Sequence, residues 1–423
     1  MKYHVIIVGA GAAGLMAMKY LSKKGYTCCM LEAASHTGGR IHTITNHGFA
    51  NSVESGAEFV HGKLPLTLKL LKKAGLKYEA IGGKMVTVQK GKWLKDEEHD
   101  PHWGEFMKRL KRLKEDCTIN DFLNEHFSHE KYKNLRKAIQ NFAEGFDLAD
   151  ITKASMLAVQ TEWQHEEDKQ FRVTGGYIQL TNYLLEESKK QNAEIFFNST
   201  VSRIEHQNND VTVYTTDNKT YTASTIIVTA SAGMLQSNAI QFFPELPEIK
   251  VNADKLGFGS VIKFLLEFKF HFWQQKNEAI GFIISDEEIP TWWTQYPAES
   301  NLLTGWLGGP KAELKSSETD DSLLSEALQS LSSIFHTDIE FLKDQLVHHA
   351  IFCWANEPHI TGGYSYNTLE SAEAKSFFAQ SIDDTLFFAG EAFYGGESQG
   401  TVEAALQSGK QVAKTINKLL RKK

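Results

Sequence analysis

The chain has 423 residues, 42% of them hydrophobic and 23% charged, which is typical of a globular protein with room for two domains. Its formal net charge of −7 argues against a nucleic-acid partner, because phosphate backbones bind basic surfaces. We expect no signal peptide and find no apolar run long enough to cross a membrane, so the sequence predicts a cytoplasmic protein. Cys28 and Cys29 are neighbours in a predicted strand and should point to opposite faces. No disulfide framework or metal site is therefore expected.

The first predicted elements form a β-α-β unit. Residues 3–8 and 26–32 are apolar runs typical of buried parallel strands, and residues 12–24 between them have helical character. From about 101 to 165, hydrophobic residues recur at spacings of three and four, which predicts an inserted helical subdomain. Further strands are predicted at 194–197, 200–206, 210–216, 224–229, 261–268 and 385–389, and further helices at 323–335 and 401–420.

A glycine-rich turn lies between the first strand and the first helix. Gly9 permits a tight turn, Gly11 lets the backbone approach a pyrophosphate, and Gly14 allows close helix–strand packing. Glu32 ends the second strand, where a carboxylate binds ribose hydroxyls and repels a 2′-phosphate. The sequence therefore predicts a dinucleotide site at this turn. Its neighbours in the same site are Ala12, Ala13 and Ala33.

Two more features select FAD rather than NAD. A glycine pair followed by arginine comes shortly after the ribose carboxylate and offers another phosphate contact. Near the C-terminus, a Gly-Glu pair precedes a second helix start, whose positive end can stabilise negative charge on a reduced flavin. The residues concerned are Gly38, Gly39, Arg40, Gly390, Glu391, Gly400, Thr401 and Val402.

With other motifs in the same order, these features resemble the flavin-containing amine oxidase family over nearly the whole chain. That family includes monoamine oxidases, polyamine oxidases, amino-acid oxidases and flavin-type histone demethylases. The matching motifs are residues 54–62, 175–180 and 226–229, Lys263, Trp354, residues 362–364, and the C-terminal stretch ending in Ala404, Ser408 and Gly409.

The resemblance implies a two-domain α/β architecture similar to that of amine oxidases and p-hydroxybenzoate hydroxylase. A Rossmann-type FAD-binding domain would comprise residues 1–80, 170–240 and 362–423. An α+β substrate-binding domain with the helical insertion would comprise residues 81–169 and 241–361. We expect a monomer or a homodimer.

The resemblance also implies individual cofactor contacts. Val201 should meet the adenine through its backbone, Glu391 should lie near the ribityl–pyrophosphate region, and the Val402 amide should point toward the flavin pyrimidine. No cysteine adjoins Tyr364, so FAD should be bound non-covalently. Other expected contacts are Gly56, Ala57, Glu58, Thr229 and Trp354.

Lys263, His61 and Tyr364 are the expected catalytic residues. The strand pattern by itself favours a solvated Lys263, opposite the apolar face. The resemblance instead implies a partly desolvated lysine that hydrogen-bonds a water beside flavin N5. His61 is expected either to line the active site or to be a structural histidine. For Glu58, a surface carboxylate is favoured over a group facing a distal substrate ammonium.

The aromatic walls of the substrate site are only partly predicted. Tyr364 matches one ring of the family's pair over the flavin, but Thr401 stands at the second position, so Phe393 or Tyr394 is considered as its replacement. A run of aromatic residues either walls an apolar amine pocket or packs in the core: Trp292, Trp293, Tyr296 and Trp306.

The implied reaction is oxidation of a C–N bond. The carbon next to the amine nitrogen would give a hydride to FAD, the imine would be hydrolysed, and O2 would be reduced to hydrogen peroxide. Two alternatives remain open: another FAD-dependent oxidase or desaturase related to protoporphyrinogen oxidase or carotenoid desaturases, and a non-catalytic flavin-binding protein. The family's amino-acid oxidases carry an arginine in the stretch aligned with Ala57-Glu58-Phe59, which pairs the substrate carboxylate. This chain has none there, so the resemblance argues against an α-amino acid substrate.

Overall fold

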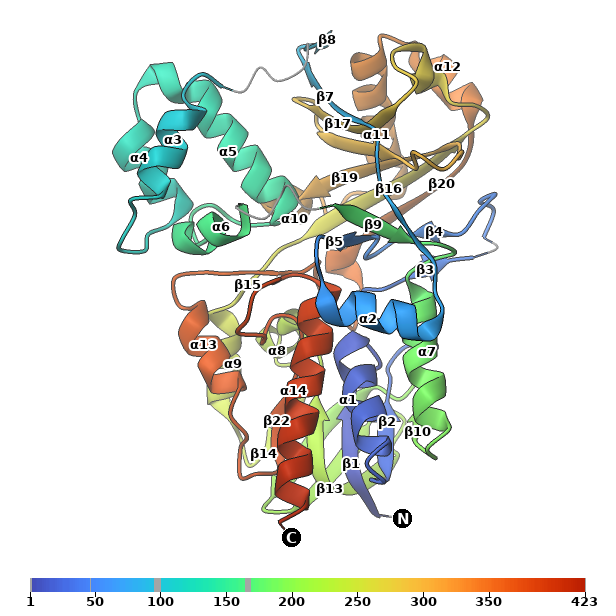
Figure 1. The fold of residues 1–423 in the computed structure, drawn as a ribbon, viewed down its shortest axis with the longest axis vertical. Helices are drawn as coiled ribbons and strands as arrows, with labels where there is room; N and C mark the ends of the chain where they lie inside the picture. Colours follow the sequence, from blue (N-terminus) through green and yellow to red (C-terminus); the bar gives the residue numbers. More distant parts are fainter. Residues whose placement is uncertain (1, 46, 95–99, 164–168, 423) are drawn as a thin grey trace.

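The computed structural model describes residues 2–45, 47–94, 100–163 and 169–422. Most of its strands form two large β-sheets toward opposite ends of the molecule, and a group of short helices lies beside the second sheet (Figure 1). Within the described residues, no helix is long and apolar enough to cross a membrane.

The first sheet contains the predicted β-α-β unit. Its central strand β1 (Lys2–Val8) pairs in parallel with β2 (Cys28–Leu31) and β13 (Thr220–Val228), and α1 (Ala12–Ser22) connects the first two strands. The sheet order is β10-β2-β1-β13-β12-β11-β14, and β22 also pairs with β13. The other strands are β10 (Glu194–Phe196), β11 (Val201–Gln207), β12 (Asp210–Thr215), β14 (Gln241–Phe243) and β22 (Leu386–Phe388).

Helices cover both faces of this sheet, because its central strands are apolar on both sides. Ile7 belongs to the core on one face and Ile6 to the core on the other. Cys28 and Cys29 divide in the same way, so the prediction of opposite faces is confirmed. The first face packs against α1, α2 (Pro65–Ala74), α7 (Ile178–Lys189) and α14 (Val402–Leu420), and the second against α8 (Ala232–Gln236), α9 (Pro247–Asp254) and α13 (Ser371–Phe378).

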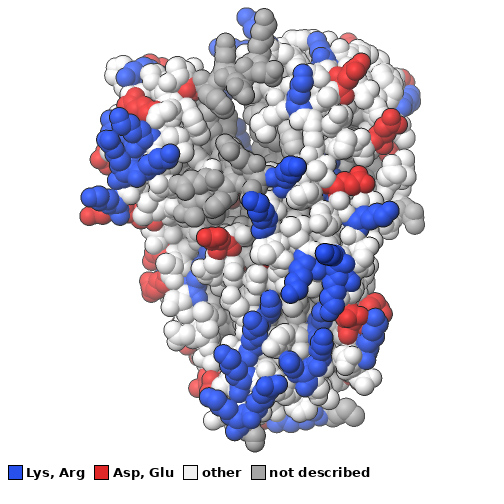
Figure 2. All heavy atoms as spheres, in the orientation of Figure 1, with Lys and Arg blue, Asp and Glu red and all other residues white. Residues whose placement is uncertain are grey.

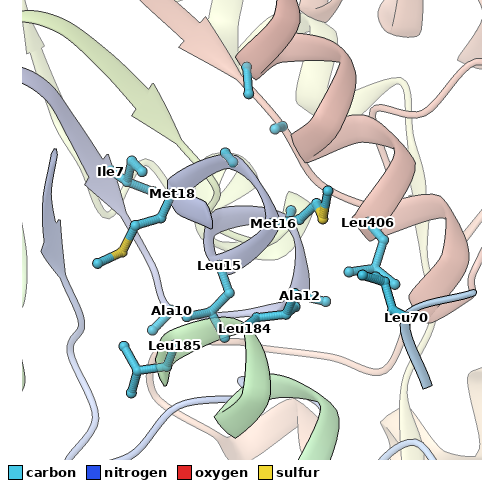
Figure 3. Packing of buried hydrophobic residues seen from close by; sticks show 14 of the residues in the cluster. Ile7, Ala10, Ala12, Leu15, Met16, Met18, Leu70, Leu184, Leu185 and Leu406 are labelled. Atoms are coloured by element: carbon cyan, nitrogen blue, oxygen red, sulfur yellow. The ribbon is translucent and has the colours of Figure 1, made fainter. Parts of the chain in front are cut away.

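The helices of the first face are amphipathic. Leu406 of α14 and Leu70 of α2 lie together in the core beside α1 (Figure 3). Each such burial contributes about 1.5–3 kcal/mol. The outward sides of these two helices carry exposed lysines, including Lys69, Lys72 and Lys414, and Figure 2 shows Lys and Arg side chains over this region. The lysines are thus the solvated sides of helices whose apolar sides form the core.

The second sheet has the order β20-β16-β19-β18-β17-β7-β8. Strand β16 (Val261–Phe268) lies between two neighbours, and all its residues are buried. Ile262 and Phe264 pack on the helical side of the sheet, whereas Leu265 contacts a different cluster on the opposite side. The remaining strands are β7 (Lys84–Gln89), β8 (Lys92–Trp93), β17 (Ile280–Ser285), β18 (Thr291–Thr294), β19 (Leu302–Gly308) and β20 (Leu346–Cys353), and the helices that follow β19 are α10 (Pro310–Leu314), α11 (Asp320–Phe335) and α12 (Ile339–Gln345).

The predicted helical insertion is present. In the sequence it follows β8 of the second sheet, and its helices lie beside that sheet. Its core is rich in aromatic side chains, with Phe106, Phe122 and Phe127 buried at its centre. The helices are α3 (Trp103–Leu110), α4 (Ile119–Phe127), α5 (Lys133–Phe146) and α6 (Met156–Trp163).

Short strands connect the two large sheets. β5 (Phe59–His61) and β6 (Tyr78–Ala80) pair with β9 (Gln170–Val173), and β3 (Thr43–Ile44) pairs with β4 (Val53–Glu54). The domain boundaries stated above remain a prediction. Strand β14, just beyond residue 240, hydrogen-bonds to the first sheet.

Candidate active site

The turn after β1 forms a backbone cradle. Gly9 has φ +99, and a Cβ on Gly14 would lie 2.1 Å from the carbonyl oxygen of Gly9, so both glycines are required by the fold. A Cβ on Gly11 would meet no atom nearer than Gly38 O at 3.9 Å, so space remains beside it. No side chain caps the start of α1 and no acidic residue lies in its first turn. Such a helix start can bind a pyrophosphate, and the cradle fits a dinucleotide.

Glu32 lies at the end of β2, directly beside this turn. Its side chain accepts hydrogen bonds from the backbone amides of Ala10 at 2.5 Å and Ala34 at 2.8 Å. Ala33 lies between, half-buried. The carboxylate therefore organises the turn itself, a role that the sequence did not predict. Since each carboxylate oxygen has two lone pairs, Glu32 keeps acceptor capacity for ribose hydroxyls.

Two motifs from opposite ends of the chain meet next to the cradle. Arg40 Nη1 donates to Glu391 Oε1 at 2.6 Å and to the carbonyl oxygen of Gly363 at 2.8 Å. Ser365 Oγ donates to the other oxygen of Glu391. The glycine before Arg40, Gly39, has φ +57, a left-handed conformation that favours glycine.

Helix α14 begins a few residues after Glu391, and a side chain caps its start. Thr401 Oγ1 accepts from the amide of Ala404 at 3.3 Å, and Gly400 has φ +70. The remaining predicted contacts lie in ordered surroundings: Gly38 (φ +117), Ala12, Ala13 and Val201 (buried), Thr229 (bonded to Val8 O), Trp354 (bonded to Ser55 O), Gly390 (bonded to Ser408), and Gly56, Ala57 and Val402 (half-buried). Their roles toward the cofactor remain predictions.

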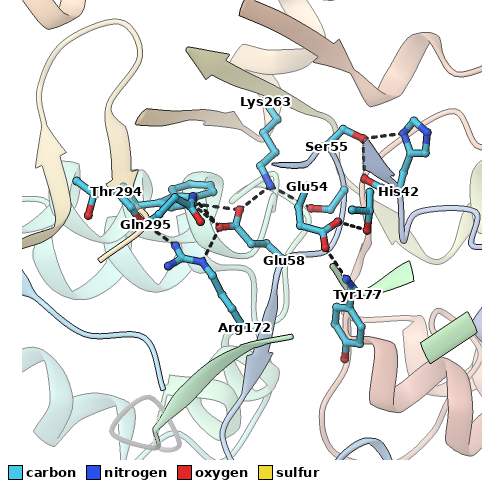
Figure 4. Close-up of polar contacts among 12 residues, drawn as sticks. His42, Glu54, Ser55, Glu58, Arg172, Tyr177, Lys263, Thr294 and Gln295 are labelled. Carbon is cyan, nitrogen blue, oxygen red and sulfur yellow. Dashed lines mark hydrogen bonds and ion pairs between the residues drawn. The ribbon is translucent and has the colours of Figure 1, made fainter. Parts of the chain in front are cut away.

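Lys263 lies on the side of β16 that faces away from α11, as the strand pattern predicted, but that side is not solvated. The side chain is 1% exposed. Its Nζ lies 2.8 Å from Glu58 Oε2, 3.2 Å from the carbonyl oxygen of Gly56, and 5.3 Å from the centre of the Trp293 ring (Figure 4). The lysine thus contacts the segment that follows β4. The amide of Ala57 in this segment donates to the carbonyl oxygen of Arg40, beside the cradle, at 2.9 Å.

Glu58 is buried, so the expectation of a surface carboxylate at this position is wrong. Its side chain is 5% exposed and also accepts from Arg172 Nε at 2.8 Å, Trp293 Nε1 at 3.1 Å and Gln295 Nε2 at 3.3 Å. Burial by itself would raise the pKa of Glu58, but the adjacent Lys263 ammonium and Arg172 guanidinium lower it to about 2. Glu58 is therefore ionised at neutral pH.

His61 is enclosed by aromatic rings. Its ring centre lies 5.9 Å from that of Phe59 and 6.0 Å from that of Phe146. Its Nδ1 is buried and has no hydrogen-bond partner among the described residues. Burial lowers the pKa of His61 to about 4, although a hydrogen bond with Gln170 acts in the opposite direction, so the imidazole is neutral at pH 7.

Aromatic rings continue from His61 to Tyr364. The Trp293 ring lies 5.6 Å from that of Phe59 and 5.8 Å from that of Trp306, and Trp306 stacks on Tyr364 at 6.5 Å with 25° between the planes. The Tyr364 hydroxyl donates to the carbonyl oxygen of Phe146 in the helical insertion. The rings of Phe59, His61, Trp293, Trp306 and Tyr364 form one wall, which we call the aromatic wall.

Two of the other aromatic candidates, Phe393 and Trp292, lie in hydrophobic cores. Phe393 packs in the core of the first sheet, 4.5 Å from the ring of Phe378, so the expectation that it replaces the second ring is wrong. Trp292 is 0% exposed in the core of the second sheet. Trp306 is the ring that stands against Tyr364.

Sequence reasoning missed Arg172, Gln295 and the ionisation of Glu54. Arg172 stands between Phe171 and Val173 in a short strand, and a lone arginine between apolar residues was the available signal. Burial raises the pKa of Glu54 to about 7, although hydrogen bonds from the Tyr177 amide and the Thr43 hydroxyl act in the opposite direction.

Comparison with protein families agrees with this geometry. The model for flavin containing amine oxidoreductases matches residues 104–417, and the model for NAD(P)-binding Rossmann-like domains matches residues 7–74. The chain belongs to the flavin-containing amine oxidoreductase family. Its cofactor is FAD, and its fold has two domains.

Relatives within this family are named for different activities. Lysine-specific histone demethylase 1B of Mus musculus is 27% identical over 98% of this chain and 53% of the relative, and polyamine oxidase 4 of Oryza sativa subsp. japonica is 26% identical over 96% and 86%. The chain thus spans about half the length of the histone demethylases it matches.

Solved structures share the whole fold. Cyclohexylamine oxidase from Brevibacterium oxydans has a TM-score of 0.84 with 20% identity and full coverage of both chains. Putrescine oxidase bound to putrescine has a TM-score of 0.83 with 19% identity over 99% of both chains.

Proposed function

We propose that this amine oxidoreductase oxidises the C–N bond of an amine to an imine, which water hydrolyses to a carbonyl compound and the released amine or ammonia. The two electrons, together with one proton from the C–H bond and one from the amine nitrogen, reduce O2 to hydrogen peroxide. The buried Lys263 carries the proposal, because it contacts both the segment that is bonded to Arg40 beside the cradle and Trp293 of the aromatic wall. FAD, when bound non-covalently, would supply the chemistry by accepting a hydride at flavin N5.

The chain itself would bind and orient the amine. The aromatic wall offers ring faces to an amine and its apolar substituent, and it keeps water away from the reacting carbon. His61 is neutral at pH 7 and so does not repel an ammonium group. Lys263 has three N–H donors, of which Glu58 and Gly56 use two. The third donor would hold a water molecule at the active site.

A panel of amines tests this function. Putrescine, spermidine, cyclohexylamine and a peptide with a methylated lysine represent the substrates that the names of the relatives and structural neighbours suggest. We expect the purified, FAD-loaded protein to release hydrogen peroxide with at least one of them, measured with a peroxidase-coupled dye. A protein that retains its flavin absorption but releases no peroxide and forms no carbonyl product with any amine would contradict the proposal.

A further inference from the structure

Glu58 is the one carboxylate that contacts Lys263 among the described residues, and two roles are possible for it. It could receive the second ammonium of a diamine, or it could serve the protein's own cations. Oε2 binds Lys263 Nζ at 2.8 Å and Oε1 binds Arg172 Nε at 2.8 Å. Trp293 Nε1 lies 3.1 Å from both oxygens, and Gln295 Nε2 lies 3.3 Å from Oε1.

The acceptor positions of this carboxylate are filled. A carboxylate has about four lone-pair positions. The four donors come from β16, β9, β18 and the residue after β18, so they approach from separate elements of the fold (Figure 4). Only 5% of the side chain is exposed. A substrate ammonium would have to displace a protein donor to bind here.

The charge of the cluster also disfavours binding of a substrate ammonium. Lys263 and Arg172 carry two positive charges and Glu58 one negative charge within a buried network. Arg172 is held further by the carbonyl oxygen of Thr294 at 2.9 Å and by the ring of Phe59, 4.9 Å from its guanidinium carbon. The carboxylate is thus committed to two fixed cations.

We infer that Glu58 is a positioning residue that fixes the Lys263 ammonium against the Gly56 carbonyl, and that it does not bind the substrate. This inference rests on the proposed function, since it concerns how Lys263 serves that reaction. A lysine side chain has four flexible bonds, and the two acceptors together restrict where its amine lies. Arg172 in turn restrains the carboxylate from the opposite side.

A double-mutant cycle between Glu58 and Lys263 tests the inference. Glu58→Gln should lower kcat about 10-fold, whereas KM should change less than about 3-fold for a monoamine and for a diamine alike. In a Lys263→Met background, the same substitution should change kcat less than about 2-fold, because the group that Glu58 positions is already absent. Cyclohexylamine and putrescine are the two probes.

Two results would overturn the inference. One is a KM for putrescine that rises 10-fold or more in Glu58→Gln while that for cyclohexylamine stays constant, which would make Glu58 a receptor for the distal ammonium. The other is an equal loss of kcat from Glu58→Gln in the Lys263 and Met backgrounds. If Glu58→Gln does not fold, Glu58→Asp keeps the charge but retracts it from Lys263, and the same pattern is expected.

A readout without turnover separates this inference from the proposed function. Glu58→Gln should lower the urea unfolding midpoint of the flavin-free protein more when Lys263 is present than in the Lys263→Met background. With Lys263 present, the substitution leaves a buried ammonium unpaired. Equal costs would overturn the pairing even if no amine is oxidised. Glu267→Gln is the matched control. Glu267 lies on the same strand and is 6% exposed, and among the described residues its carboxylate accepts from the Ala50 amide alone, so both kcat and KM should stay at the wild-type values.

Discussion

Arg40 Nη1 lies 2.6 Å from Oε1 of Glu391, a residue 351 positions further along the chain. This ion pair joins the segment after β2 to the segment that follows β22. The cradle beside it is formed by backbone and by contacts within the chain, including the hydrogen bonds that the amides of Ala10 and Ala34 donate to Glu32. We therefore expect the cradle to be formed before FAD binds.

Gly11→Ala should weaken FAD binding without weakening the apoprotein. A Cβ at this position meets no protein atom within 3.9 Å, and φ of −73° suits alanine, so apoprotein stability should change by less than about 0.5 kcal/mol. The methyl group would nevertheless occupy the space predicted for the pyrophosphate. The expected dissociation constant is about 10- to 100-fold higher, measured by flavin fluorescence titration.

Gly14→Ala is the contrasting control for that measurement. Its Cβ would lie 2.1 Å from the backbone oxygen of Gly9, so the apoprotein itself should lose more than about 2 kcal/mol of stability. Unchanged FAD affinity in Gly11→Ala would place the pyrophosphate elsewhere.

His61 should make the protein less stable in mild acid. Burial lowers its pKa to about 4 in the native state. As the pH falls below about 6.5, His61 is therefore protonated in the unfolded chain but stays neutral in the native state. The free energy of unfolding should therefore fall by about 1–3 kcal/mol between pH 6.5 and pH 4, and this loss should be absent in His61→Gln. Urea unfolding of both proteins at pH 7.5 and pH 4.5 measures the difference. Parallel losses would show that His61 is not buried as a neutral group.

Glu54 should have the opposite effect. Its pKa is raised by burial to about 7, so native stability falls as pH rises from about 4.5 to 7 and then stays constant. Glu54→Gln, which never ionises, should be more stable than wild type by about 1–3 kcal/mol at pH 8 and equal to it at pH 4.5. Thermal unfolding at the two pH values checks this. A variant less stable at pH 8 would mean that the hydrogen bonds to Tyr177 and Thr43 require the carboxylate.

Trp306→Leu should impair amine binding more than it impairs folding. Trp306 is half-buried and stacks on Tyr364 in the aromatic wall, and such ring contacts with a cation or apolar group contribute about 1–2 kcal/mol. The expected KM is thus about 5- to 30-fold higher for the best amine, from steady-state peroxide release. Trp292→Phe, in the core one strand away, should lower the unfolding midpoint and leave KM unchanged. If Trp306→Leu lowered the unfolding midpoint and left KM unchanged, Trp306 would not belong to the substrate site.

The local parts of the fold could be predicted from the sequence. The β-α-β unit was correct to within a few residues, because its apolar runs and glycine spacing are all contained in the first 32 positions. Helix α11 begins three residues before the predicted start, at Asp320, since Thr319 accepts the capping bond from Ser322. Hydrophobic periodicity locates a helix but does not fix its end.

The contacts of the candidate site could not be predicted in the same way. Glu58 is separated from Lys263 by 205 positions and from Arg172 by 114, so no local pattern marks it as buried. The alternation in β16 did place Lys263 on the correct side. It could not show that this side is also covered, because the covering segments come from elsewhere in the chain.

The adjacent thiols of Cys28 and Cys29 make the first sheet chemically observable. Each lies in a different core layer, and burial raises the pKa of both to about 12. An alkylating reagent that attacks thiolates at pH 8 would therefore label them only in molecules whose central strands have separated. Their labelling rate would report how often this sheet opens, and a bound dinucleotide that stabilises the closed sheet would slow it.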